Sequence, residues 1–90
     1  MNEERFRELF DDEKSDIKTE FPDGDNALMG LNLIAKYLPK AGIEAAGHDI
    51  IYSVDIDKIV EAGITEEDAI TLVKWNWMID SDCDCLACFV

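Results

Sequence analysis

The sequence predicts a single α+β domain in which helices pack against a small three-stranded antiparallel sheet. Its 90 residues are enough for one modest hydrophobic core and no more. Apolar residues recur at helical spacing in residues 26–38 and alternate as in a strand near residue 77. Glycine, proline and acidic turn residues separate these segments at short intervals, as expected for a compact domain.

Residues 1–17 are predicted to form a peripheral helix that docks on the rest of the chain. Asn2 can cap a helix over residues 2–14, and Glu3 then lies in the first turn, where the helix dipole favours acidic side chains. The apolar stripe of this segment is narrow and consists of Phe6, Leu9, Phe10 and Ile17. Only a peripheral position suits a stripe of this width.

Residues 26–90 are predicted to form the core of the domain, after a turn marked by Pro22 and Gly24. Residues 26–38 should form a mostly buried central helix. Residues 48–54 are rich in strand-forming side chains and predict a short strand. The apolar positions of the central helix are Ala27, Leu28, Leu31, Ile34, Ala35 and Leu38.

Two short helices separated by a tight turn should follow. Asp55 is placed to cap a helix over residues 56–62, and Gly63 is placed to end it in a left-handed conformation. Thr65 and Asp68 resemble a capping box, with aspartate standing in for the usual glutamate. A second helix is therefore expected from Thr65 to about residue 74.

A hairpin completes the chain. Trp75, Trp77 and Ile79 alternate with more polar residues, which predicts a strand over residues 75–80. The segment 85–90 returns as the last strand. From residue 26 onward, the predicted elements follow a winged-helix-like order, with the hairpin as the wing.

The net charge of −13 is extreme for a chain of this size. Residues 1–26 carry ten acids and four bases, and residues 48–90 carry ten acids and two bases. Between them lies a nearly neutral segment with one acid and two bases. A surface field of this sign repels nucleic acid and anionic membranes and speeds encounters with basic partners.

Direct nucleic-acid binding is therefore not expected, despite the winged-helix-like order. A recognition helix needs basic or amide side chains, and residues 65–74 offer only Lys74, at the far end. In the hairpin turn, Asp80, Asp82 and Asp84 would also repel phosphate.

The cysteines raise the alternative of a metal site. Cys83, Cys85 and Cys88, with His48 as a fourth ligand, are the candidates, but only Cys85 and Cys88 have the spacing of a usual zinc ligand pair. The aspartates of the hairpin turn imitate the first ligands of a calcium loop. However, Cys85 stands at its glycine position, and the closing glutamate would fall beyond the C terminus. No metal and no cofactor are expected.

Catalysis is not predicted either. His48 is the only histidine, and neither a glycine-rich phosphate loop nor an oxyanion element accompanies it. The odd number of cysteines and the absence of an apolar opening segment predict free thiols and a cytoplasmic location. No apolar run reaches the roughly 18 residues of a membrane-spanning helix, so no membrane partner is expected.

Surface carboxylates remain as the candidate functional site. Helix capping accounts for Asp68 but does not account for the neighbouring acids. Carboxylates held at intervals on a rigid domain can imitate the phosphates of a duplex and compete for a basic groove. The predicted partner-binding residues are Glu61, Glu66, Glu67, Asp68, Asp80, Asp82 and Asp84. The expected partner is a basic nucleic-acid-binding protein, while the sequence does not indicate the oligomeric state.

Residues 47–90 resemble a group of small acidic proteins from phages and prophages. The shared features are a His-Asp-aliphatic-aliphatic-Tyr strand, a Glu-Glu-Asp helix start, a tryptophan-containing strand and a terminal Phe-Val. Asn76 stands where the group usually has glycine before the tryptophan. The residues that carry the resemblance are His48, Asp49, Ile51, Tyr52, Glu66, Glu67, Asp68, Leu72, Trp77, Phe89 and Val90.

The resemblance implies a mobile-element context and no enzymatic activity. Small acidic proteins of that origin are often inhibitors of host defence, including anti-CRISPR proteins. The leading expectation is therefore a phage-encoded inhibitor, acting in the host cytoplasm by nucleic-acid mimicry. The alternatives are an antitoxin or immunity-type protein that neutralises a basic nuclease, a small metal-binding domain that uses the C-terminal cysteines, and a structural phage component.

Overall fold

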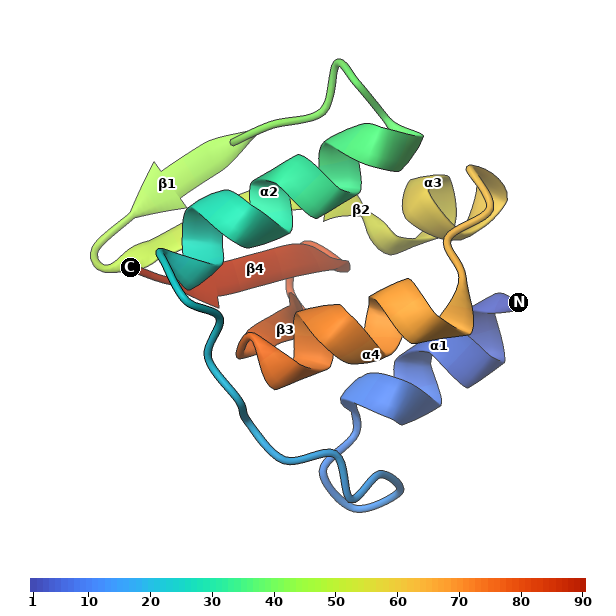
Figure 1. Cartoon of the computed structure of the whole chain (residues 1–90). Helices are drawn as coiled ribbons and strands as arrows, with labels where there is room; N and C mark the ends of the chain where they lie inside the picture. Colours follow the sequence, from blue (N-terminus) through green and yellow to red (C-terminus); the bar gives the residue numbers. More distant parts are fainter.

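The computed structural model describes all 90 residues and shows an α+β domain with two layers (Figure 1). Four helices lie on one face of a four-stranded antiparallel sheet with the strand order β1-β2-β4-β3. The elements are α1 (Glu3–Phe10), α2 (Asn26–Tyr37), β1 (Ala45–Gly47), β2 (Ile50–Asp55), α3 (Ile56–Glu61), α4 (Glu66–Lys74), β3 (Trp77–Asp80) and β4 (Cys85–Phe89). The α+β class is confirmed, with four strands instead of three.

The additional strand, β1, lies at the edge of the sheet and pairs with β2. Its sequence is Ala-Ala-Gly, and all three residues are exposed. No β-branched or aromatic side chain marks it, so the sequence carries no strand signal there. His48 and Asp49 form the two-residue loop between β1 and β2 instead of opening a strand. His48 adopts a φ of 48°, as the first residue of such tight loops often must.

Helix α1 ends at Phe10, four residues earlier than predicted. Its start is as expected, because the Asn2 side chain accepts a hydrogen bond from the Arg5 amide at 2.8 Å. After Phe10 come three acids, which are unfavourable at the negative end of a helix dipole. The Asp11 carboxylate accepts the amide of Glu13 at 2.9 Å and so stabilises a turn in place of more helix.

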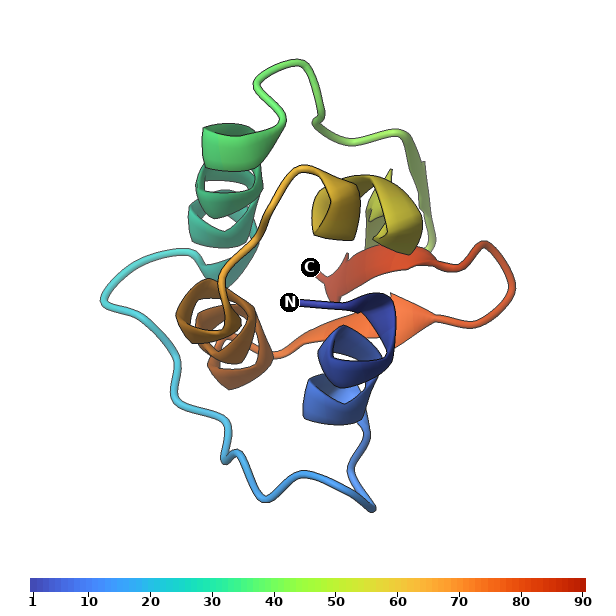
Figure 2. The same cartoon turned by 90° about the vertical axis from the view of Figure 1, so that its right-hand side faces the viewer.

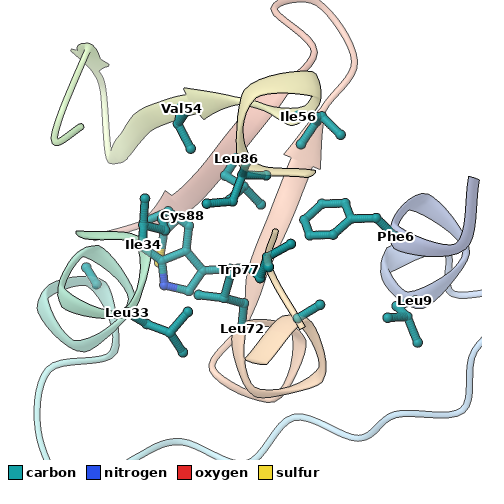
Figure 3. Close-up of a cluster of buried hydrophobic side chains, with 14 of the residues drawn as sticks. Phe6, Leu9, Leu33, Ile34, Val54, Ile56, Leu72, Trp77, Leu86 and Cys88 are labelled. Carbon is teal, nitrogen blue, oxygen red and sulfur yellow. The ribbon is translucent and has the colours of Figure 1, made fainter. Parts of the chain in front are cut away.

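The same helix contributes more to the core than a peripheral position would require. Phe6 is completely buried and Leu9 is 4% exposed. Figure 3 shows Phe6 pointing from α1 into the interior, toward Ile56 and Leu86. A narrow stripe is therefore sufficient, because Phe6, a large aromatic side chain, and Leu9 both reach the core.

Helix α2 buries Ala27 and Ile34 as predicted, but its buried face is rotated from the one that the sequence predicts. Leu28 was expected to be buried but is 57% exposed, whereas Gly30 and Leu33 are buried. The reason is Trp77, whose indole lies against the backbone of Gly30 and donates a hydrogen bond to the Asn26 carbonyl at 3.1 Å. The tryptophan thereby determines the rotation of α2.

The two-helix turn largely follows its predicted chemistry. Gly63 ends α3 with a φ of 93°, and the Thr65 side chain caps α4 by accepting the Asp68 amide at 3.1 Å. Asp55 precedes α3, but its side chain makes no capping hydrogen bond and lies 3.7 Å from the Lys58 ammonium.

The strand predicted to begin at Trp75 begins two residues later. Trp75 instead ends α4, where its amide donates to the Thr71 carbonyl at 3.0 Å and the next amide, of Asn76, donates to the Val73 carbonyl at 3.0 Å. Asn76 then turns the chain with a φ of 65°, a conformation that asparagine tolerates better than most residues. Strand β3 therefore begins at Trp77.

One face of the sheet is covered by the helices and the other is not, as Figure 2 shows. Cross-strand partners share a face, so Cys88 lies on the covered side together with its partners Ile51 and Trp77. A register shift between Tyr52 and Asp55 brings Asp55 opposite Cys85. The uncovered face carries Ile50, Tyr52, Asp55, Met78, Asp80, Cys85, Ala87 and Phe89.

Candidate functional site

The C-terminal cysteines do not form the candidate metal site. A disulfide joins Cys83 to Cys85, so the expectation of free thiols is wrong for this pair. Cys88 is free and buried on the helix side, and burial raises the pKa of its thiol. His48 lies beyond the other end of β2, roughly 15 Å or more from Cys85 at about 3.3 Å per strand residue. No three His, Cys, Asp or Glu side chains are arranged to hold a metal ion.

The same placement separates the residues of a Cys–His nucleophile. His48 is exposed in the β1–β2 loop, while the disulfide lies at the opposite end of the sheet. The free thiol of Cys88 is completely buried under α2 and faces away from the solvent. The thiols and the imidazole therefore do not meet.

The seven predicted partner-binding carboxylates fall into two groups separated by α1. The α3–α4 carboxylates are Glu61, Glu66, Glu67 and Asp68, and the hairpin carboxylates are Asp80, Asp82 and Asp84. Arg5 pairs with Glu66 of the first group, and Arg7 pairs with Asp84 of the second. Side chains two residues apart on a helix point about 200° apart, so α1 lies between the two groups.

Glu66 has an intramolecular role in the structure. The Arg5 guanidinium donates a hydrogen bond to its carboxylate, and this bond raises the pKa of Arg5. Both side chains are about half exposed, so the pair contributes little to stability in water. Even so, part of the charge of Glu66 is already neutralised by α1.

Asp84 makes more intramolecular hydrogen bonds than Glu66 does. Arg7 donates to both of its carboxylate oxygens at 2.7 Å, in the bidentate geometry that guanidinium favours. This interaction lowers the pKa of Asp84 and raises the pKa of Arg7, which also bonds Glu3. The Asp84 carbonyl accepts the Ile56 amide at 3.0 Å. Asp84 therefore ties the hairpin turn to α1 and to the start of α3.

Asp68 takes part in an extended helix cap. In a capping box, the third side chain reaches back to the amide of the capping residue. Here the Tyr37 hydroxyl accepts the Thr65 amide at 3.3 Å and donates to the Asp68 carboxylate. Lys36 adds a contact at 3.2 Å. The hydrogen bond from Tyr37, followed by that from Lys36, lowers the pKa of Asp68.

Asp80 stabilises the hairpin turn, where its carboxylate accepts the amides of Asp82 and Cys83 at 2.9 and 3.3 Å. Four of the seven carboxylates thus have partners within the chain. Glu61, Glu67 and Asp82 are exposed and make no intramolecular ion pair or side-chain hydrogen bond. These three remain fully available to another molecule.

The structure also contains a hollow that the sequence did not predict. It has a volume of about 410 Å³ and lies on the uncovered face of the sheet, at the end next to the hairpin turn. Its walls include Glu44, Tyr52, Asp55, Asp80, Asp82 and the Cys83–Cys85 disulfide. The β1–β2 hairpin meets the β3–β4 turn here, so only long-range strand pairing brings these residues together.

No helix of the structure is both long and apolar enough to cross a membrane. Comparison of the chain with models of known protein families, with curated proteins and with solved structures found no match. The arrangement of side chains is therefore the basis for a functional proposal.

Proposed function

We propose that this protein is a binding protein without catalytic activity, whose acidic surface occupies a basic, nucleic-acid-binding surface of another protein. The observation that carries the proposal is the pair Glu61 and Glu67. Both are exposed beside the α3–α4 turn, and neither has a partner within the chain. Folding requires neither carboxylate, whereas binding to a basic surface would use both.

The surroundings of this pair suit nucleic-acid mimicry. The α3–α4 turn is held by Gly63 and by the Thr65 cap, so the carboxylates extend from a fixed backbone. In the winged-helix-like order of elements, α4 occupies the place of the helix that contacts DNA. It presents acids in its first turn, as a competitor for a basic groove would.

The phage and prophage resemblance of residues 47–90 suggests what such binding would achieve. An inhibitor of a host nucleic-acid-binding protein, such as an anti-CRISPR protein, would act in the host cytoplasm through this surface. An antitoxin or immunity-type protein that neutralises a basic nuclease would use the same chemistry. The identity of the captured protein distinguishes the two.

The test uses the full chain as bait in a nuclease-treated bacterial lysate, with the captured proteins identified by mass spectrometry. A purified captured protein is then titrated with the wild type and with the double variant Glu61→Lys/Glu67→Lys. We expect the double variant to bind at least tenfold more weakly and duplex DNA to displace the wild type. Added salt should steeply weaken the binding of the wild type to the captured protein.

The matched control is the double variant Asp23→Lys/Asp49→Lys, which changes the net charge by the same amount at two exposed acids outside α3 and α4. It should bind nearly as tightly as the wild type. Equal weakening by this control would show that only net charge matters. Unchanged binding of Glu61→Lys/Glu67→Lys, or no competition by DNA, would contradict the proposal.

A further inference from the structure

The uncovered face of the sheet is apolar along most of its length. Ile50, Tyr52 and Met78 are half-buried there, and Phe89 is 58% exposed. Ala87 lies among them and is completely buried by its neighbours. Apolar sheet faces are usually covered by another layer, and here all four helices lie on the opposite side (Figures 1 and 2).

At the end of the sheet next to the β3–β4 turn, this apolar strip borders the hollow, where carboxylates take the place of apolar side chains. Tyr52 and the disulfide form apolar walls, and Glu44 and Asp82 contribute carboxylates without intramolecular partners. Two bases lie nearby: Lys58, whose ammonium is 3.7 Å from the Asp55 carboxylate, and Lys40, which lines a neighbouring pocket together with Glu44 and Lys58. The four carboxylates of the hollow outnumber these bases, so the face is apolar at one end and acidic at the other.

We propose that this face is the docking surface for a basic amphipathic helix of a partner protein. Charge complementarity identifies the occupant, because a lysine or arginine stem can lie along Tyr52 while its charged head reaches the carboxylates of the hollow. A second copy of the chain would bring its own −13 charge against the same carboxylates, which opposes self-association.

The dimensions of the face define the helix. Strand β4 has five residues, about 17 Å at 3.4 Å per residue, which a helix of about 11 residues or three turns would match. Its apolar side chains, repeating at i, i+3, i+4 and i+7, would cover Tyr52, Ala87 and Phe89. This surface is distinct from Glu61 and Glu67, so the inference does not depend on nucleic-acid mimicry.

The probe is a synthetic 12-residue peptide of leucine, alanine and lysine, designed as an amphipathic helix with lysines concentrated at one end. Its control is a permuted peptide of identical composition without an apolar face. Both are titrated into the ¹⁵N-labelled full chain and followed by NMR. We expect the amphipathic peptide to shift amide signals of β2, β3 and β4, and the permuted peptide to bind at least fivefold more weakly.

Two variants locate the binding on the protein. Phe89→Ser should lower the affinity for the amphipathic peptide about fivefold or more. Phe21→Ser should leave the affinity unchanged, because Phe21 is 61% exposed and lies outside the sheet. Asp82→Asn should weaken binding and reduce its dependence on salt. The side chains of Phe89, Phe21 and Asp82 are exposed, and an unchanged NMR spectrum of each free variant verifies its fold.

Three outcomes would overturn the inference. The permuted peptide could bind as tightly, which would indicate attraction by net charge alone. The shifts could map to the surface around Glu61 and Glu67. Sedimentation could reveal a dimer that Phe89→Ser dissociates, in which case a second copy covers this face. None of these outcomes bears on the displacement of the protein by DNA.

Discussion

Tyr37 completes a helix cap that its sequence position does not reveal. A glutamate in place of Asp68 could reach the Thr65 amide directly, whereas the shorter aspartate bonds a tyrosine hydroxyl that lies between them. Tyr37 is 31 residues away from Asp68, so the motif at residues 65–68 gives no indication of it. Capping by Thr65 was predictable, because it depends on neighbours in the chain.

Tyr37→Phe should therefore destabilise the protein. The variant leaves the Thr65 amide and the Asp68 carboxylate without their shared partner, which we expect to cost about 1–2 kcal/mol in the free energy of unfolding. Urea denaturation followed by circular dichroism measures this value. Tyr52→Phe is the control, because the Tyr52 hydroxyl has no hydrogen-bond partner in the chain. Equal effects of the two variants on the free energy of unfolding would argue against a stabilising role of the Tyr37 hydroxyl between Thr65 and Asp68.

The lowered pKa of Asp68 also makes the free energy of unfolding depend on pH. Its pKa in the folded protein is lowered by the hydrogen bonds from Tyr37 and Lys36, below an ordinary value of 3.8. The stabilisation is therefore fully present above about pH 3.8 and is lost as the pH falls through the lower folded pKa.

Asp68→Asn should accordingly flatten the fall of the unfolding free energy below pH 4. Urea denaturation at several pH values between 2 and 6 measures the slope. Asp82→Asn removes the same charge from a side chain without an intramolecular partner and serves as the control. A variant of Asp68 with the wild-type slope would show that its hydrogen bonds contribute nothing to acid sensitivity.

Gly30 is needed because an indole occupies the space of its side chain. A Cβ at this position would lie 2.0 Å from Trp77 Nε1, far closer than any normal contact. Helical propensity alone would favour Gly30→Ala by about 1 kcal/mol, but overpacking against the rigid indole should cost about 1–3 kcal/mol.

The expected net result for Gly30→Ala is destabilisation, together with a changed Trp77 environment in near-ultraviolet circular dichroism. Gly42→Ala is the control, because a Cβ there meets nothing within 4 Å. It should be neutral or slightly stabilising through the unfolded chain. A stabilised Gly30→Ala variant would mean that Trp77 does not lie against α2.

At the scale of elements, α1 is held to the domain by the buried side chains of Phe6 and Leu9 and by two ion pairs. Phe6 is completely buried, whereas the Arg5–Glu66 pair is half exposed on both sides. Burial of an aromatic ring outweighs exposed ion pairs, which typically contribute 1 kcal/mol or less. The ion pairs orient α1, and Phe6 attaches it.

We expect Phe6→Ala to lower the free energy of unfolding by about 3–5 kcal/mol. Arg5→Ala should lower it far less, because its ion pair with Glu66 is exposed to water. Urea denaturation compares the two variants, and NMR shows whether α1 separates locally in Phe6→Ala while the sheet remains intact. If Arg5→Ala lowered the free energy of unfolding more than Phe6→Ala, the inference that Phe6 attaches α1 to the domain would be wrong.

Elements with a local signal were predictable, and those without one were not. The Thr65 cap and Gly63 determine the α3–α4 turn within a few residues of sequence. Strand β1 has no such signal, because Ala45–Gly47 becomes a strand only through pairing with β2. The pairing of Cys83 with Cys85 was missed for a different reason: the odd cysteine count was taken to indicate free thiols, although two of the three can still pair.

At the scale of the whole molecule, the excess of 21 acids over eight bases dominates the electrostatics. The charge could be read directly from the sequence, and so could the candidate carboxylates. Their distribution could not, because α1 places its arginines against Glu66 and Asp84 from more than 60 positions away. The hollow likewise depends on strand order, which composition does not determine.

Salt should stabilise this protein instead of weakening it. Its ion pairs are few and mostly exposed, so screening them costs little, whereas screening the repulsion among the remaining acids is favourable. Raising NaCl from 0.1 to 1 M shortens the screening length from about 10 to about 3 Å. We expect the Tm to rise by a few °C in calorimetry. Glu61→Gln/Glu67→Gln, with less repulsion to screen, should show a smaller rise, and a falling Tm would contradict this account.

The exposed edge of β1 has a further consequence for the chain in acid. Its outer N–H and C=O groups are unpaired, and the Ala-Ala-Gly sequence offers no charge or proline that would deter another strand from pairing with it. Mutual repulsion between molecules therefore protects this edge near neutral pH. The isoelectric point is about 4.1, and there the repulsion vanishes while the edge remains. Edge-to-edge aggregation should thus begin at β1. As the pH is lowered, it should start where the net charge approaches zero, at a higher pH than acid unfolding.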